Sequence, residues 1–176
     1  MQKIILALCL LVGNSYAQTY KSEKSSVVFF SDAALEDIKA ENTKGTSTIN
    51  ITTQEFKFTL KNINFEFEKA LMKEHFNEKY METERYREST FVGTFSGFDP
   101  KKIGEQEVST KGKLLIHGQT KEVEIPARME LKDGKLKALA KFKVKLNDYK
   151  IKIPKLLWQN IAEEVEVSVD FTYQSQ

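Results

Sequence analysis

The chain has 176 residues, and its 27 Lys and Arg residues nearly balance 25 Asp and Glu residues at a formal net charge of +2. This balance gives no reason to expect nucleic acid or an anionic membrane as the main partner. A chain of this length can bury enough side chains to build the core of one domain.

Residues 1–17 have the pattern of a secretory signal peptide. Lys3 supplies the positive start, residues 4–12 form an apolar stretch, and Ser15-Tyr16-Ala17 is a small-x-small cleavage site. The stretch is far shorter than the roughly 20 residues of a membrane-spanning helix, so we predict no integral membrane segment.

The mature chain, residues 18–176, is expected to be one domain. The single cysteine, Cys9, lies in the signal peptide, so the domain has no disulfide and depends on core burial for its stability. We expect a periplasmic address, with outright secretion as the less favoured alternative.

The first part of the domain predicts two strands, a helix and a hairpin. Residues 24–31 form a strand, residues 32–39 a short helix, and Gly45 opens a second strand. The arms of the hairpin carry six alternating apolar residues: Phe56, Phe58, Leu60, Ile63, Phe65 and Phe67. A turn at Lys61-Asn62 would place all six on one face, although Lys-Asn is a mediocre turn pair.

Residues 69–84 change to a helical period and predict an amphipathic helix, or two short helices broken near Asn77. Residues 90–97 return to a strand in which large side chains alternate with glycines on one face. Residues 98–107 predict a polar loop.

Residues 108–146 predict a three-stranded antiparallel meander. Its third strand carries apolar residues on one face and lysines on the other. Asp133-Gly134 predicts a type I′ turn that places Leu131 opposite Leu136, and Gly118-Gln119 suits a two-residue turn with glycine first.

The chain ends with further strand signals. Tyr149, Ile151 and Ile153 alternate with lysines and predict a continuing or bent strand, and Pro154 can start a short helix that runs to Ile161. Residues 165–173 alternate valine and aromatic residues with polar ones and predict the final strand.

These elements amount to about eight strands with few helices and no βαβ alternation, which predicts an all-β fold. One face of nearly every strand is apolar. Two short helices cannot cover so much apolar surface, whereas a sheet closed into a barrel covers it and leaves no open edge. We therefore expect an antiparallel β-barrel.

Several motifs resemble those of a known family. The stretch Gly112-x-Leu114-x-Ile116-x-Gly118-x-Thr120-Lys121-x-Val123 resembles the G-x-L-x-(I/F)-x-G-x-T-K-x-V signature of the YceI-like lipid or polyisoprenoid-binding family. Residues 71–91, Asp148-Tyr149 and the acidic-valine last strand also match, so the likeness covers essentially the whole mature chain. One departure is Arg87, which stands where the family usually has a proline and affects a local turn.

The resemblance implies a lipocalin-like antiparallel barrel of about eight strands with one or two short helices, enclosing an apolar tunnel. Members are generally exported, and those with a known ligand hold a long isoprenoid chain such as a quinone-type lipid. The implied partner is an isoprenoid or other long-chain apolar lipid. The resemblance implies no enzyme, no cofactor and no catalytic residue, and a homodimer is left open.

The apolar faces supply the residues that we expect to line such a tunnel: Phe56, Phe58, Phe65, Phe67, Met72, Phe76, Phe91, Phe95, Leu114, Ile116, Ile125, Ala138, Ala140, Phe142, Val144, Trp158 and Phe171. Small residues among large rings favour a channel for a linear chain. The alternative is a barrel filled by these side chains, which would act as an envelope stress or interaction module through its outer surface.

The remaining polar residues predict no catalytic site and no metal site. The chain lacks the glycine-flanked serine of hydrolases and the zincin helix, and its two histidines, His75 and His117, have no clear third ligand nearby. His117 is expected on the solvated face of its strand. The lysine stripe of residues 135–152 is expected to be a solvated outer face, with an acidic partner as the alternative.

Overall fold

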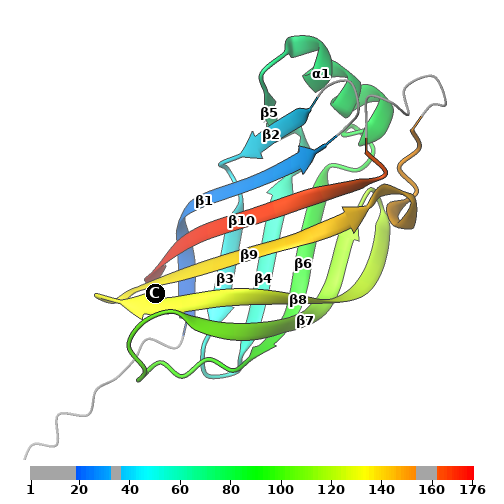
Figure 1. The fold of residues 1–176 in the computed structure, drawn as a ribbon. Helices are drawn as coiled ribbons and strands as arrows, with labels where there is room; N and C mark the ends of the chain where they lie inside the picture. The colour runs from blue at the N-terminus through cyan, green and yellow to red at the C-terminus, as the bar shows by residue number, and fades with distance from the viewer. Residues whose placement is uncertain (1–18, 33–36, 154–161) are drawn as a thin grey trace, which may run out of the picture.

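The computed structural model describes residues 19–32, 37–153 and 162–176, which form an antiparallel sheet closed into an eight-stranded barrel (Figure 1). The strands follow one another round the barrel in this order: β10 (Glu164–Ser175), β9 (Lys135–Lys145), β8 (Gln119–Lys132), β7 (Gln106–Ile116), β6 (Glu88–Ser96), β4 (Glu55–Lys61), β3 (Thr46–Asn50) and β1 (Thr19–Ser31). β1 pairs with β10 and closes the ring.

Short elements gather at one end of the barrel. β1 pairs with β3 at its start and with β2 (Ile38–Asn42) at its end, and β5 (Glu66–Phe67) extends the sheet beyond β2. The α-helix α1 (Ala70–His75) and the π-helical turn η2 (Phe76–Tyr80) follow β5 and cover this end of the barrel (Figure 1). The 3-10 turns are η1 (Asn62–Asn64) and η3 (Leu146–Tyr149).

The described residues include no helix that is both long and apolar enough to cross a membrane.

The meander has the predicted faces. Leu131 lies opposite Leu136, and Asp133 and Gly134 both have positive φ, as a type I′ turn requires. The predicted β7–β8 turn was wrong by one residue. His117 and Gly118 form it, both with positive φ, and Ile116 pairs with Gln119. The register therefore moves by two residues, so the same side chains still face the interior.

The predicted turn at Lys61-Asn62 was wrong. β4 pairs with β3 and β6, whereas β5 pairs with β2, so the two aromatic runs do not form a hairpin. Asn62 is fully buried. Its side chain donates to the Tyr86 carbonyl oxygen at 2.7 Å and accepts from the Ser89 hydroxyl at 2.8 Å. These bonds satisfy the buried side-chain amide of Asn62. Ile63, which the predicted hairpin placed on the apolar face, is 51% exposed.

Of the two alternatives predicted for residues 69–84, the structure has the two short helices broken near Asn77, because α1 ends at His75 and η2 begins at Phe76, although η2 already ends at Tyr80. Other predictions need correction or cannot be placed. Tyr149 ends η3, and Lys150 after it is left-handed, so the predicted strand through 149–153 does not form. Of the helix predicted for residues 32–39, Ile38 and Lys39 belong to β2. Residues 1–18, 33–36 and 154–161 lie outside the described residues, so the signal peptide predicted for residues 1–17 and the helix predicted after Pro154 stay predictions.

The lysine stripe lies on the outer face, where acids of β10 neutralise much of it. Lys141 pairs with Glu166 at 2.8 Å and Lys143 with Glu164 at 3.0 Å. The hydrogen bond with Glu164 raises the pKa of Lys143. Exposed pairs of this kind contribute little stability, but they leave less positive charge for an acidic partner.

Two glycines let β6 and β7 approach closely. Gly93 lies directly opposite Gly112. A Cβ atom on Gly93 would meet the Lys111 carbonyl oxygen, and one on Gly112 would meet the Val92 carbonyl oxygen. The obstacle at both positions is backbone rather than a side chain that can turn away.

Gly93→Ala is therefore expected to lower the free energy of unfolding by about 2 kcal/mol, as overpacking does. Urea denaturation monitored by circular dichroism measures the change. Val92→Ala, at an exposed position on the same strand, is the matched control and should have a much smaller effect. Equal unfolding midpoints for the two variants would contradict a close approach of the strands.

Candidate ligand-binding cavity

The barrel is hollow and encloses a cavity of about 560 Å³. This volume falls within the range of small-molecule sites in proteins. Most of the lining is aliphatic or aromatic, with few polar side chains, among them Ser89, Thr90 and Thr110. The Thr110 hydroxyl donates to the Ile125 carbonyl oxygen at 2.7 Å, so it offers little to a ligand. A filled barrel, the alternative reading of the sequence, would leave no such space.

The structure brings together all the predicted lumen residues that it describes. The following residues line the cavity: Phe56, Phe58, Phe65, Phe67, Met72, Phe76, Phe91, Phe95, Leu114, Ile116, Ile125, Ala138, Ala140, Phe142, Val144 and Phe171. Trp158 lies outside the described residues. Contact of these side chains with a ligand stays a prediction.

Aromatic rings form two groups along the cavity. The mouth cluster consists of Phe29, Phe65, Phe67 and Phe76, with ring centroids 5.1 to 5.8 Å apart in the contacting pairs. The deep cluster consists of Phe56, Phe58, Phe91 and Phe171, with contacting pairs at 4.8 to 5.4 Å. Phe29 was missed because it lies in the continuous apolar run of residues 27–30, where alternation cannot show which side chain faces inward.

Two small side chains lie on the cavity wall beside the deep cluster. Ala138 and Ala140 project from β9, which stands four strands away from β4 in the ring of eight, so β9 and β4 form opposite walls. Ala138 pairs with Phe171, whose ring meets that of Phe58, so the rings of the deep cluster span the lumen next to this alanine. The two alanines contribute only methyl groups to the lining and leave more of the interior unfilled than larger side chains would.

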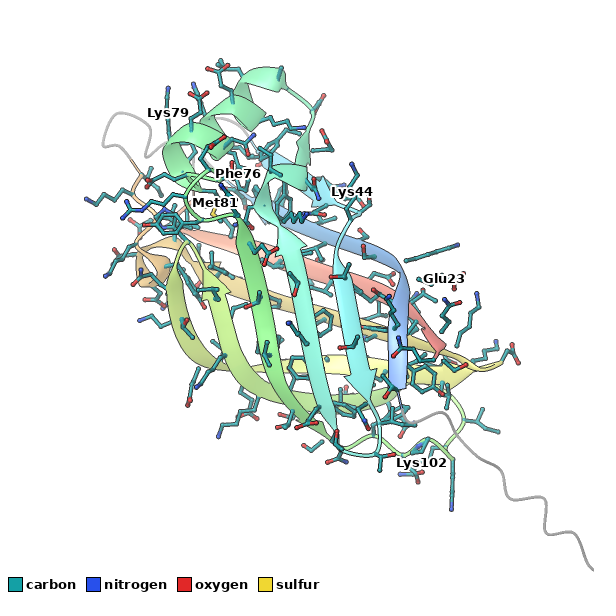
Figure 2. The ribbon with its side chains drawn as sticks, turned by 180° about the vertical axis from the view of Figure 1, so that it is seen from behind. Glu23, Lys44, Phe76, Lys79, Met81 and Lys102 are labelled. Atoms are coloured by element: carbon teal, nitrogen blue, oxygen red, sulfur yellow. The ribbon has the colours of Figure 1, made fainter. Side chains whose placement is uncertain are left out.

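The cavity opens at the end that α1 covers. Leu71 of α1 lines the cavity and is 60% exposed to solvent. Phe76 and Met81 also line it at this end of the barrel, where Figure 2 labels them; Phe76 is partly buried and Met81 is buried. Lys69 and Tyr80 also line this end. Partial burial raises the pKa of the Tyr80 phenol. The polar groups of the site are thus concentrated near its mouth.

The other end is closed by a packed floor. Tyr20, Leu136 and Tyr173 are at most 2% exposed, and the Tyr173 hydroxyl donates to Ser47 Oγ at 3.0 Å. Burial raises the pKa of the Tyr173 phenol far above its usual range, and the Ser47 hydrogen bond offsets this only in part. A ligand that enters at the mouth therefore meets a blind end.

His117 does not lie on the solvated face, as the sequence predicted, but is only 6% exposed. The turn register explains the error, because His117 is the first turn residue rather than the last strand residue. Its ring nitrogens lie near the Tyr149 carbonyl oxygen and Glu82. Among the described residues, no three His, Cys, Asp or Glu side chains are grouped so that they could hold a metal ion.

The family model for the YceI-like domain matches residues 19–173 of this chain. Comparison with curated proteins found no match.

Solved structures with this fold share little sequence with the chain. A polyisoprenoid-binding domain from Saccharophagus degradans, implicated in plant cell wall breakdown, is 14% identical with a TM-score of 0.76, and the match covers 91% of this chain and 99% of that one. Burkholderia cenocepacia BcnA is also 14% identical, with a TM-score of 0.72 and coverage of 84% and 95%. The Campylobacter jejuni YCEI protein is 16% identical with a TM-score of 0.56 over both full chains. At these identities the likeness establishes the fold.

Tyr173 predicts how stability depends on pH. An unfolded tyrosine loses its proton near a pH of about 10, whereas the folded protein keeps this phenol neutral at higher pH. Each further pH unit should therefore cost about 1.4 kcal/mol of stability through Tyr173. Tyr173→Phe should be about 1 kcal/mol less stable than the wild type near neutral pH, because it loses a hydrogen bond, but it should lose less stability above pH 10.

Denaturant unfolding between neutral pH and about pH 11 measures both effects. Ser47→Ala is the matched control, because it removes the same hydrogen bond and keeps the phenol, so its alkaline slope should equal that of the wild type. An unchanged slope in Tyr173→Phe would show that the phenol ionises in the folded protein as it does in the unfolded chain.

Proposed function

We propose that this chain, which belongs to the YceI-like family, is a binding protein that holds a long apolar lipid of the polyisoprenoid or isoprenoid-quinone type inside its barrel. Carriage, storage and protection of the lipid are all compatible with this role. The observation that carries the proposal is the almost wholly apolar cavity with one blind end.

The cavity favours a linear apolar chain on energetic grounds. Each methylene group transferred from water to such a lining contributes about 0.8 kcal/mol, so a long chain needs few polar contacts for tight binding. The blind end accepts a tail more readily than a polar head group, since its lining offers few hydrogen-bond partners. The head group would then lie at the mouth, near Lys69, His75 and Tyr80.

The polyisoprenoid-binding domain from Saccharophagus degradans supports this ligand class, because it shares the fold over nearly its whole length. We propose binding without turnover and without a cofactor. The proposal extends to export: the signal-peptide pattern of residues 1–17 would deliver the domain to the periplasm, where apolar lipids need a carrier to cross water.

Filling the lumen should abolish lipid uptake and preserve the fold. Ala140→Trp places a large ring into the cavity, and we expect the affinity for an isoprenoid quinone to fall at least about tenfold, because many buried methylene contacts are displaced. Displacement of the fluorescent apolar probe N-phenyl-1-naphthylamine measures affinity. Organic extraction and mass spectrometry of the purified wild type should yield a bound lipid.

Lys141→Trp, which places the same ring on the exposed outer face of β9, is the matched control and should bind like the wild type. Repeatedly empty extracts, together with no uptake of quinones or prenyl alcohols by the wild type, would overturn the proposed function. Equal affinity in the two Trp variants would mean that the ligand lies elsewhere.

Export predicts a defined N-terminus. In a bacterial host the protein should be recovered from the periplasmic fraction with an intact mass that begins at Gln18, since cleavage is expected after Ala17. A full-length chain retained in the cytosol would argue against the signal peptide, and Ala17→Arg should prevent cleavage if the assigned site is right.

A further inference from the structure

His117 joins three elements at the mouth of the cavity. It lies in the β7–β8 turn; its Nδ1 atom is 3.0 Å from the Tyr149 carbonyl oxygen of η3, and its Nε2 atom is 3.3 Å from Glu82 Oε1. The Tyr86 ring packs on the imidazole with centroids 4.2 Å apart. We call His117, Glu82, Tyr86 and the Tyr149 carbonyl group the clasp.

The two acceptors fix the proton content of a fully bonded clasp. A carbonyl oxygen only accepts, so Nδ1 must carry a proton to bond Tyr149. The Glu82 carboxylate also accepts, so Nε2 must carry a second proton to bond it. Only the imidazolium form of His117 donates to both partners, and both hydrogen bonds are then charge-assisted.

Left-handed backbone conformations gather at the same place. His117 has φ of 48°, Glu82 has φ of 43°, and Lys150, directly after Tyr149, has φ of 56°. Residues other than glycine adopt these angles at a cost in free energy, and such residues tend to cluster at functional sites. Three of the four members of the clasp, His117, Glu82 and Tyr149, therefore lie on, or next to, a residue whose backbone the surroundings hold in place.

The clasp anchors a segment that contributes to the cavity wall. The mouth segment, residues 81–86, follows the cavity-lining residues Phe76 and Tyr80 and begins with the lining residue Met81. Its far end is held where the Tyr86 carbonyl oxygen accepts from Asn62. No residue of α1 or η2 is fully buried, and the ring contacts of Phe76 with the mouth cluster are their main packing against the barrel.

From this arrangement we infer that His117 is a positioning residue that holds the mouth segment across the opening and thereby sets the rate at which a lipid enters and leaves the cavity. The inference rests on the proposed function. The apolar lining determines how tightly a lipid binds, whereas the clasp determines how often the mouth opens.

Stopped-flow uptake and release of N-phenyl-1-naphthylamine tests the clasp. In His117→Phe and Glu82→Met, which keep most of the side-chain volume but cannot form the hydrogen bond between the two residues, we expect both rates to rise about tenfold, as loss of one charge-assisted hydrogen bond allows, while the dissociation constant changes less than about threefold. The double variant should be no faster than either single one.

Glu84→Met, at an exposed acid on the same segment, is the matched control and should keep the wild-type rates. Unchanged rates in both clasp variants, or additive effects in the double variant, would each overturn the inference. Amide hydrogen exchange of residues 76–86 provides a readout that needs no ligand, and protection there should fall in both clasp variants. If the wild type takes up no apolar probe, the proposed function fails, and hydrogen exchange alone decides whether the clasp holds the mouth segment.

Discussion

The antiparallel pairing of β1 with β10 closes the sheet on itself, and the cavity exists only because of this closure. Ten residues of β1, from Tyr20 to Phe30 with one irregularity near Lys24, pair with β10. An open sheet of these strands would expose one apolar face to water, whereas the closed sheet encloses that face on all sides and leaves no strand edge between β1 and β10. Closure converts an unfavourable surface into an interior.

Whether such an interior is full or hollow depends on side-chain size. Eight-stranded barrels can be either full or hollow, because their interior is just wide enough to be filled by side chains or to hold one small ligand. Here Ala138 and Ala140 contribute only methyl groups to the lining, and Gly93 and Gly112 contribute no side chain at all. At the floor, the large side chains of Tyr20, Leu136 and Tyr173 belong to one buried cluster. The same barrel is therefore solid at one end and hollow toward the other.

Most of the fold and lumen could be predicted from the sequence, because strand alternation alone decides which side chains share a face. The error at Gly118-Gln119 left the faces intact, since a two-residue change of register preserves alternation. Two failures have a common cause. Asn62 was placed in a turn, and His117 on the solvated face of a strand, from strand alternation and assumed turn positions, but each is buried and forms hydrogen bonds to residues more than 20 positions away. Local patterns carry no information about such distant partners. The length of the helices over the mouth was overestimated because their amphipathic pattern continues past the point where the chain turns.

The apolar lining of the cavity and the polar clasp at its mouth control different properties, the affinity for a lipid and the rate of its exchange. Burial of a lipid chain is non-directional and grows with its length, so an apolar lumen alone would bind long lipids tightly and release them slowly. A carrier must also let its ligand go. The mouth segment, and not the lipid, makes the directional contacts of Glu82 and Tyr86 with His117. A change in these contacts alters how often the mouth opens and leaves the apolar contacts of the bound lipid as they are. The polar clasp on an otherwise apolar site is thus where exchange can be tuned independently of affinity.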